Sequence, residues 1–124
     1  MVCLRINDPK EDAMLVCYVR SRVDEAKKDA YIESFRRCAA VSLDEDGVIV
    51  YRLAVDPDDR EVVYTIQMWT TAEAFEKHQD APHHLQRLDD LASLGVVMEE
   101  IEIVDGGISR NDLARVSVQG SAET

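Results

Sequence analysis

The fold of this chain is decided by residues 62–69, Val62-Val63-Tyr64-Thr65-Ile66-Gln67-Met68-Trp69. The stretch is rich in β-branched and aromatic residues and contains neither Gly nor Pro, which predicts a β-strand with apolar residues on both faces. Thr70 and Thr71 follow at once, and either hydroxyl can cap a helix, although only Thr70 together with Glu73 completes a capping box. We therefore expect a strand that runs directly into a helix ending near residue 79.

The remaining strands are predicted from the same kind of pattern. Residues 13–22 and 48–55 carry apolar side chains on both alternating faces, and residues 96–104 form a further run rich in β-branched residues. Five turn-forming residues at 56–60 separate the second strand from the third. A connection of that length and composition predicts that these two strands form a hairpin.

Apolar residues at helical spacing predict a long helix from about residue 24 to residue 41. A later helix is expected to start at Pro82, which suits the first helical turn, and to end at Gly95. Its apolar stripe is predicted to consist of Leu85, Leu88, Leu91, Ala92 and Leu94. The order β-α-β-β-α-β predicts an α+β fold of the ferredoxin-like type, with one antiparallel sheet covered by helices on one face.

Helices on one face do not account for strands that are apolar on both faces. The second apolar face needs a cover, and the simplest cover is the same face of another subunit. We therefore expect a homodimer in which two sheets pack face to face as a dimeric α/β barrel.

Length, charge and cysteine content limit the classes of function. The 124 residues predict one domain at 13–105, between an N-terminal extension at 1–12 and a Ser-, Gly- and Ala-rich tail at 106–124. A formal net charge of −11 argues against nucleic acid and anionic membranes as partners. No apolar run approaches the ~18 residues of a membrane span, and no signal peptide is evident. Three widely spaced cysteines without zinc-site spacing predict a cytoplasmic protein.

Four segments resemble the antibiotic biosynthesis monooxygenase family, small dimeric α+β barrel proteins that include quinol monooxygenases and polyketide-oxidising enzymes. They are 47–51 (Gly-Val-Ile-Val-Tyr), 64–69 (Tyr-Thr-Ile-Gln-Met-Trp), 74–78 (Ala-Phe-Glu-Lys-His) and 81–83 (Ala-Pro-His). The resemblance runs from about residue 14 to residue 104. The family pattern has an acidic residue two positions before the Trp, where this chain has Gln67, and an amide cannot act as a base.

The resemblance implies a cofactor-independent monooxygenase that oxidises a small aromatic or quinol-like substrate with dioxygen, without metal, flavin or haem. Such a site must bind a planar apolar molecule, favour its anion and exclude water. The predicted catalytic residues are Trp69, as a wall or N–H donor, and His78, as a base or proton donor. The predicted substrate-binding residues are Tyr51, Arg52, Tyr64, Gln67 and His83.

Structural roles compete with each of these assignments. A lone Trp on a strand commonly belongs to the core, and a His near a helix end commonly packs or hydrogen-bonds there. No metal site is predicted, because no carboxylate stands at a ligand spacing from the three histidines. Haem is not expected either, because residues 13–22 lack the Asn found in related haem-degrading proteins. Two other functions stay open: a non-catalytic dimeric module for a small ligand or a protein, and an isomerase with His78 as a proton shuttle.

Overall fold

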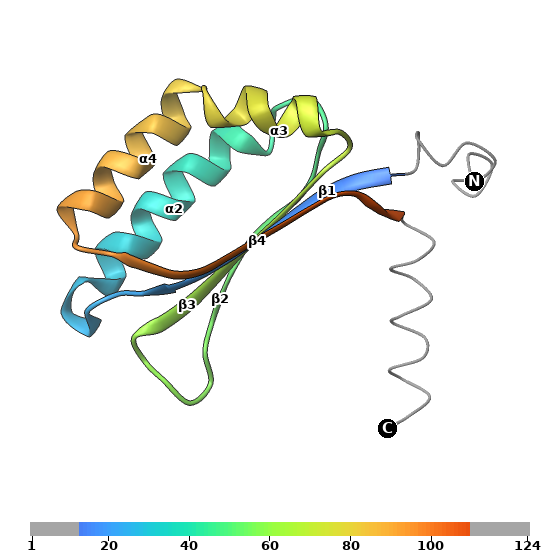
Figure 1. Cartoon of the computed structure of the whole chain (residues 1–124). Helices are drawn as coiled ribbons and strands as arrows, with labels where there is room; N and C mark the ends of the chain where they lie inside the picture. The colour runs from blue at the N-terminus through green and yellow to red at the C-terminus, as the bar shows by residue number, and fades with distance from the viewer. Residues whose placement is uncertain (1–12, 110–124) are drawn as a thin grey trace, which may run out of the picture.

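Four strands pair into one antiparallel sheet in the computed structural model, which describes residues 13–109. They are β1 (Ala13–Arg22), β2 (Val48–Val55), β3 (Val62–Trp69) and β4 (Val97–Ser109), in the order β2-β3-β1-β4 across the sheet. The stretch that decides the fold, β3, thus lies between its hairpin partner β2 and the first strand. With helices on one face of the sheet (Figure 1), this confirms the predicted α+β, ferredoxin-like fold.

The helices are α2 (Lys28–Ser42), α3 (Ala72–Gln79) and α4 (Pro82–Ser93), and a short 3-10 turn, η2 (Glu25–Lys27), precedes α2. Of the two predicted caps for α3, Thr71 is the one used, since its hydroxyl oxygen accepts a hydrogen bond from the Ala74 N–H at 3.1 Å. No helix among the described residues combines the length and apolar character needed to cross a bilayer.

The apolar stripe predicted for α4 is correct at Leu91 and Leu94, which pack in the core, but wrong at Leu85, Leu88 and Ala92, which are exposed. The buried side chains of this helix are His84, Arg87 and Leu91, whereas Leu85 and Leu88 are 50% and 39% exposed. α4 packs mainly against α2, where Arg87 donates to the Tyr31 hydroxyl at 3.3 Å and Asp90 accepts from the Ser34 hydroxyl at 2.8 Å. This docking turns two polar side chains, rather than two leucines, toward the sheet.

The strand β4 is longer than predicted. It continues to Ser109 because its last residues pair with Ala13 and Met14 of β1, past a register shift between Met14 and Leu15. Residues 106–109, predicted as the start of a tail, therefore belong to the sheet. The predicted N-terminal extension and the rest of the predicted tail lie outside the described residues.

The core fills the space between the sheet and the helices. Trp69 has no exposed surface and belongs to a cluster with Leu15, Cys17, Phe35, Cys38, Ala39, Tyr51 and Phe75. Burying a side chain such as that of Phe75 contributes about 1.5–3 kcal/mol, so this cluster holds α2 and α3 against the sheet. Cys17 and Cys38 are free and buried, as is common for cysteines that pack as small apolar residues.

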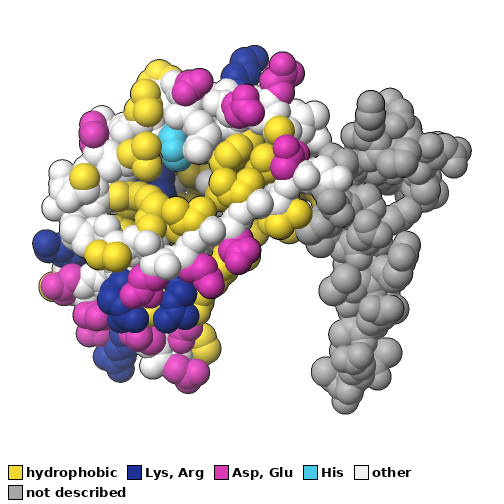
Figure 2. Space-filling model, in the orientation of Figure 1, with side chains coloured by type: hydrophobic (Ala, Val, Ile, Leu, Met, Phe, Trp, Pro, Cys, Tyr) yellow, Lys and Arg dark blue, Asp and Glu magenta, His cyan; other side chains and the backbone are white. Residues whose placement is uncertain are grey.

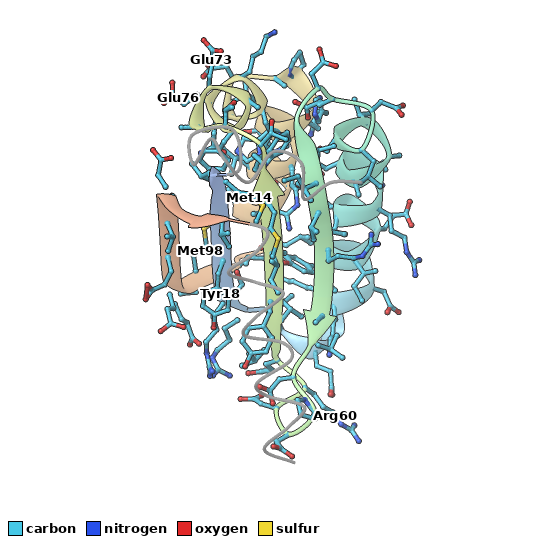
Figure 3. The ribbon with its side chains drawn as sticks, turned by 90° about the vertical axis from the view of Figure 1, so that its right-hand side faces the viewer. Met14, Tyr18, Arg60, Glu73, Glu76 and Met98 are labelled. Atoms are coloured by element: carbon cyan, nitrogen blue, oxygen red, sulfur yellow. The ribbon has the colours of Figure 1, made fainter. Side chains whose placement is uncertain are left out.

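The opposite face of the sheet is left open by the helices (Figure 3). One end of this open face is polar: Tyr18 stacks on Tyr64 with ring centroids 6.0 Å apart, and Arg20 and Arg22 both form ion pairs with Glu99. The other end carries partly exposed apolar side chains, which are Val16, Val50, Ile66 and Met68. Dimerisation through this face stays a prediction.

Candidate active site

A cavity of ≈ 190 Å³ lies between the helix-covered face of the sheet and the helices. Residues of β1, β3, β4 and all three α-helices line it, and Figure 2 shows the hollow between the helices and β4, with mainly hydrophobic walls. A histidine and a basic side chain are visible in the hollow (Figure 2). Its polar lining residues are Ser21, Tyr31, Thr65, Gln67, Gln79, His84 and Arg87.

Arg87 places a buried positive charge at this cavity. Its side chain projects from α4, is 8% exposed, and donates a hydrogen bond from Nη2 to the hydroxyl of Tyr31 at 3.3 Å. The guanidinium also lies over the rings of Tyr31 and Phe35, 5.5 Å from each centroid. Its Nε has no hydrogen-bond partner, and none of the ion pairs among residues 13–109 includes it. A buried cation without a carboxylate favours an anion in the adjoining space.

His84, one helical turn before Arg87, places a neutral imidazole at the same cavity. Burial, followed by the nearby charges of His78 and Arg87, lowers the pKa of His84 to about 4. The ring is therefore uncharged at neutral pH and can accept a proton. Its Nδ1 is buried and has no hydrogen-bond partner.

Trp69 acts on the cavity through Gln67. The indole Nε1–H donates a hydrogen bond to Oε1 of Gln67 at 2.9 Å. Because indole nitrogen is only a donor, this bond fixes the amide orientation and leaves the NH₂ group of Gln67 as the free donor at the cavity wall. Of the residues predicted from the sequence to form the site, Gln67 is the one that lines the cavity, and Trp69 lies behind it in the core.

His78, the other predicted catalytic residue, is fully buried behind His84 rather than in the cavity lining. Its ring centroid lies 4.7 Å from that of His84 and 4.8 Å from that of Trp69. Its Nδ1 is 2.7 Å from Oε1 of Glu45, and Nε2 of His83 is 2.6 Å from the same oxygen. Burial outweighs the effect of Glu45 and lowers the pKa of His78.

Glu45 is brought to these histidines by the loop between α2 and β2. The Thr70 N–H donates to the carbonyl of Gly47 at 2.7 Å, which fastens the loop to the end of β3. Gly47 has a φ of +87°, and a Cβ there would lie 2.7 Å from the Cβ of Ala74. Only glycine suits this conformation and this close approach to α3.

Glu45, His78 and His83 each offer one possible metal-ligand atom, and these three atoms lie within 4.8 Å of one another. This separation is compatible with three ligands of one divalent cation. The premise behind predicting no metal site therefore does not hold, because Glu45 supplies the carboxylate from a loop 33 residues before His78. Nδ1 of His78 and Nε2 of His83 are both already paired with the Glu45 carboxylate. The arrangement is therefore also complete as a hydrogen-bonded cluster.

The other predicted substrate-binding residues do not line the cavity. Tyr51 is buried beside Phe35, with its hydroxyl 3.3 Å from the Cys38 sulfur. Arg52 and Tyr64 point to the open face, since side chains alternate along β2 and β3, and the Tyr64 hydroxyl donates to Asp56. Sequence reasoning missed Arg87 and Glu45, and His84 is not among the residues predicted for the site. The spacing of 84, 87 and 91 along α4 is a helical pattern that could have pointed to a polar inward face.

The fold and the site together define a class of protein: a ferredoxin-like domain with a cavity of mixed polar and apolar lining under its helices. The profile of the antibiotic biosynthesis monooxygenase family matches residues 14–88, which is more than half of the chain. The chain therefore belongs to the antibiotic biosynthesis monooxygenase family.

Similar solved structures share this fold. A conserved protein of unknown function from Bacteroides thetaiotaomicron is 27% identical, with a TM-score of 0.69 over 75% of this chain and 97% of that chain. SnoaB, a cofactor-independent oxygenase from Streptomyces nogalater, is 20% identical, with a TM-score of 0.66 over 79% of this chain and 97% of its own. A conserved protein from Methanosarcina mazei is 15% identical, with a TM-score of 0.69 over 77% and 95%. No match is found among curated proteins.

Proposed function

We propose that this chain is a cofactor-independent monooxygenase that oxidises a small aromatic or quinol-like substrate with dioxygen in the cavity between sheet and helices. The observation that carries the proposal is Arg87, a buried guanidinium without a carboxylate partner in residues 13–109, at the wall of a largely apolar cavity. Such a charge selects an anion, and a deprotonated phenol, quinol or anthrone is an apolar, planar anion.

The reaction needs no external reductant, because the substrate supplies all the electrons. A methylene flanked by aromatic rings reacts with one O₂ to give a ketone and one water, and a hydroquinone with one O₂ gives a hydroxyquinone and one water. The substrate must first lose a proton to become electron-rich enough to reduce oxygen. The protein's tasks are therefore to remove that proton, stabilise the anion and exclude bulk water.

The cavity offers a group for each of these tasks. Neutral His84 accepts the proton, while Arg87 and the amide NH₂ of Gln67 stabilise the oxyanion. In this scheme Trp69 and His78, predicted as the catalytic pair, act from behind the wall. Trp69 orients Gln67, and His78 packs against His84.

Membership of the monooxygenase family supports the proposal. Two observations favour a non-catalytic module that binds an anionic ligand instead: none of the described lining residues is a carboxylate, and Gln67 holds the family's acidic position. The two functions differ in turnover and not in binding, so an experiment must measure both.

Oxygen consumption with an anthrone or a hydroquinone tests the proposal. The parent protein should consume one O₂ per substrate without added metal or flavin, and His84→Gln should lower kcat by about 10²-fold. Asp89→Asn, a change of an exposed residue on the same helix, should leave the rate unchanged. Circular dichroism checks that each variant is folded.

Ligand binding is followed in parallel through the fluorescence of the chain's one Trp. Binding of a phenolate without oxygen consumption would identify a binding module. Absence of both would refute the proposed site.

A further inference from the structure

His78 lies behind the cavity residue His84, and one nitrogen of its ring can complement an unpaired nitrogen of the His84 ring. His84 Nδ1 and His78 Nε2 are both buried and both lack a hydrogen-bond partner, and their two rings lie in contact with centroids 4.7 Å apart. Leaving a buried polar atom unpaired costs about 1–3 kcal/mol. Two unpaired nitrogens on adjoining rings can satisfy each other through one bridging water, provided that one carries a proton and the other does not.

Glu45 determines which of the two carries the proton. An ionised carboxylate only accepts hydrogen bonds, so His78 Nδ1, at 2.7 Å, must be protonated and His78 Nε2 must hold a lone pair. Burial alone would raise the pKa of Glu45, but the hydrogen bonds from His78 and His83 outweigh burial and lower it. The carboxylate is therefore ionised at neutral pH.

The tautomer of His84 follows from that of His78. To complement the lone pair on His78 Nε2, the proton of neutral His84 must sit on Nδ1. The lone pair of His84 is then on Nε2, the nitrogen left for the cavity that this ring lines. Neutral histidine in water prefers the opposite tautomer, with its proton on Nε2. Glu45 and His78 would therefore hold His84 in the tautomer whose lone pair, the basic site, is on the cavity-facing Nε2.

We infer that Glu45, His78 and His84 form a proton relay that holds His84 as the cavity base and carries its proton to Glu45 and back. For the reaction that it serves, the relay rests on the proposed function. Glu45 and His78 are positioning residues, because they reach the substrate only through His84. His83, whose side chain is 17% exposed, bonds to the same carboxylate oxygen at the surface end.

The transfers balance over one turnover. The substrate proton binds to Nε2 of His84, the Nδ1 proton of His84 passes to Nε2 of His78, and the Nδ1 proton of His78 passes to Glu45. Once oxygen has added to the substrate carbanion, the same transfers in reverse deliver the proton to the peroxide oxygen, which later leaves as water. The return also restores both starting tautomers, so no ring has to rotate.

The surroundings keep both imidazoles uncharged, as the relay requires. The titratable and charged groups that face His78 are Glu45, His83, His84 and Arg87, with the Tyr51 ring at 5.6 Å. Burial is the main influence on both relay histidines and lowers the pKa of each, and the positive charge of Arg87 acts in the same direction. A ring that was already protonated could not accept the next proton.

Long-range ¹H–¹⁵N spectra of the histidine rings test the relay without reference to activity. The chain has three histidines, so single His→Gln variants assign every signal. At pH 7 we expect Nδ1–H on His78, Nδ1–H on His84 and Nε2–H on His83. Glu45→Gln should shift His84 toward the Nε2–H tautomer, and Asp44→Asn, which changes an exposed carboxylate on the same loop, should not.

Three spectral results would overturn the relay. They are Nε2–H on His84 in the parent protein, a His84 tautomer that is indifferent to Glu45→Gln, and stoichiometric capture of added Zn²⁺ by His78 and His83, which would make the cluster a metal site.

Kinetics separate this inference from the proposed function. In a parent protein that consumes oxygen, Glu45→Gln should lower kcat by about 10-fold or more with KM nearly unchanged, and Glu45→Asp should recover part of the rate. An active parent whose kcat is unaffected by Glu45→Gln would refute the relay and leave the monooxygenase proposal standing. Predicted tautomers in a parent without oxygen consumption would refute the monooxygenase and support the relay.

Discussion

Replacing Arg87 with Met should separate the stability of the fold from the binding of an anion. The two side chains are both long and unbranched near the backbone, but Met carries no charge. In the native protein the guanidinium is buried, makes one hydrogen bond to Tyr31 at 3.3 Å, and lies 5.5 Å above the rings of Tyr31 and Phe35. Nothing among the described residues neutralises it by an ion pair, so its removal leaves no carboxylate stranded.

The contributions to the free energy of unfolding oppose each other. Loss of the two cation–π contacts costs about 0.5–1 kcal/mol each, and loss of the hydrogen bond to Tyr31 costs about 1 kcal/mol. Against this, replacing buried charge with an apolar side chain of similar volume is commonly neutral or stabilising by about 1–4 kcal/mol. We therefore expect the free energy of unfolding to change by less than about 2 kcal/mol in either direction.

Binding should change much more than stability. A phenolate would lose a charge-assisted hydrogen bond worth about 1.5–3 kcal/mol, which corresponds to a rise in Kd of about 10- to 150-fold. Fluorescence titration of Trp69 measures Kd, and urea denaturation measures unfolding. Arg87→Lys keeps the charge and should give an intermediate Kd. A Met variant that binds the phenolate as tightly as the parent but unfolds far more easily would show that Arg87 is structural.

Two further predictions concern pH and assembly. Because burial, and then the charges of His78 and Arg87, lower the pKa of His84 from 6.5 to about 4, the unfolded chain binds its proton more tightly. The free energy of unfolding should therefore rise between about pH 4 and pH 6.5, and urea denaturation of His84→Gln should show a flatter rise; an equal slope would contradict the burial of this ring. Sedimentation equilibrium at micromolar concentration should give about twice 14.0 kDa, and Ile66→Glu on the open face should give a folded monomer. A parent chain that is itself a folded monomer would rule out the face-to-face dimer.

The strands were determined by the sequence itself. β1, β2 and β3 begin and end at the residues that the apolar pattern predicts, because alternation along a strand is a local property that needs no knowledge of the partner strand. Pro82 likewise starts α4 as predicted. The two candidate caps at Thr70 and Thr71 were a genuine ambiguity of the sequence, and the bond from Thr70 to Gly47 accompanies the use of Thr71 as the cap.

The site was decided by the tertiary structure. Hydrophobicity alone favoured the leucine stripe of α4, but packing against α2, where Arg87 bonds to Tyr31, turned His84 and Arg87 inward. Glu45 lies 33 residues before His78 and meets it only because Gly47 lets its loop lie against α3. Periodicity reports which side chains of one segment share a face. The rotation of a docked helix and the resting place of a loop depend instead on packing between distant segments, which no single stretch of sequence encodes.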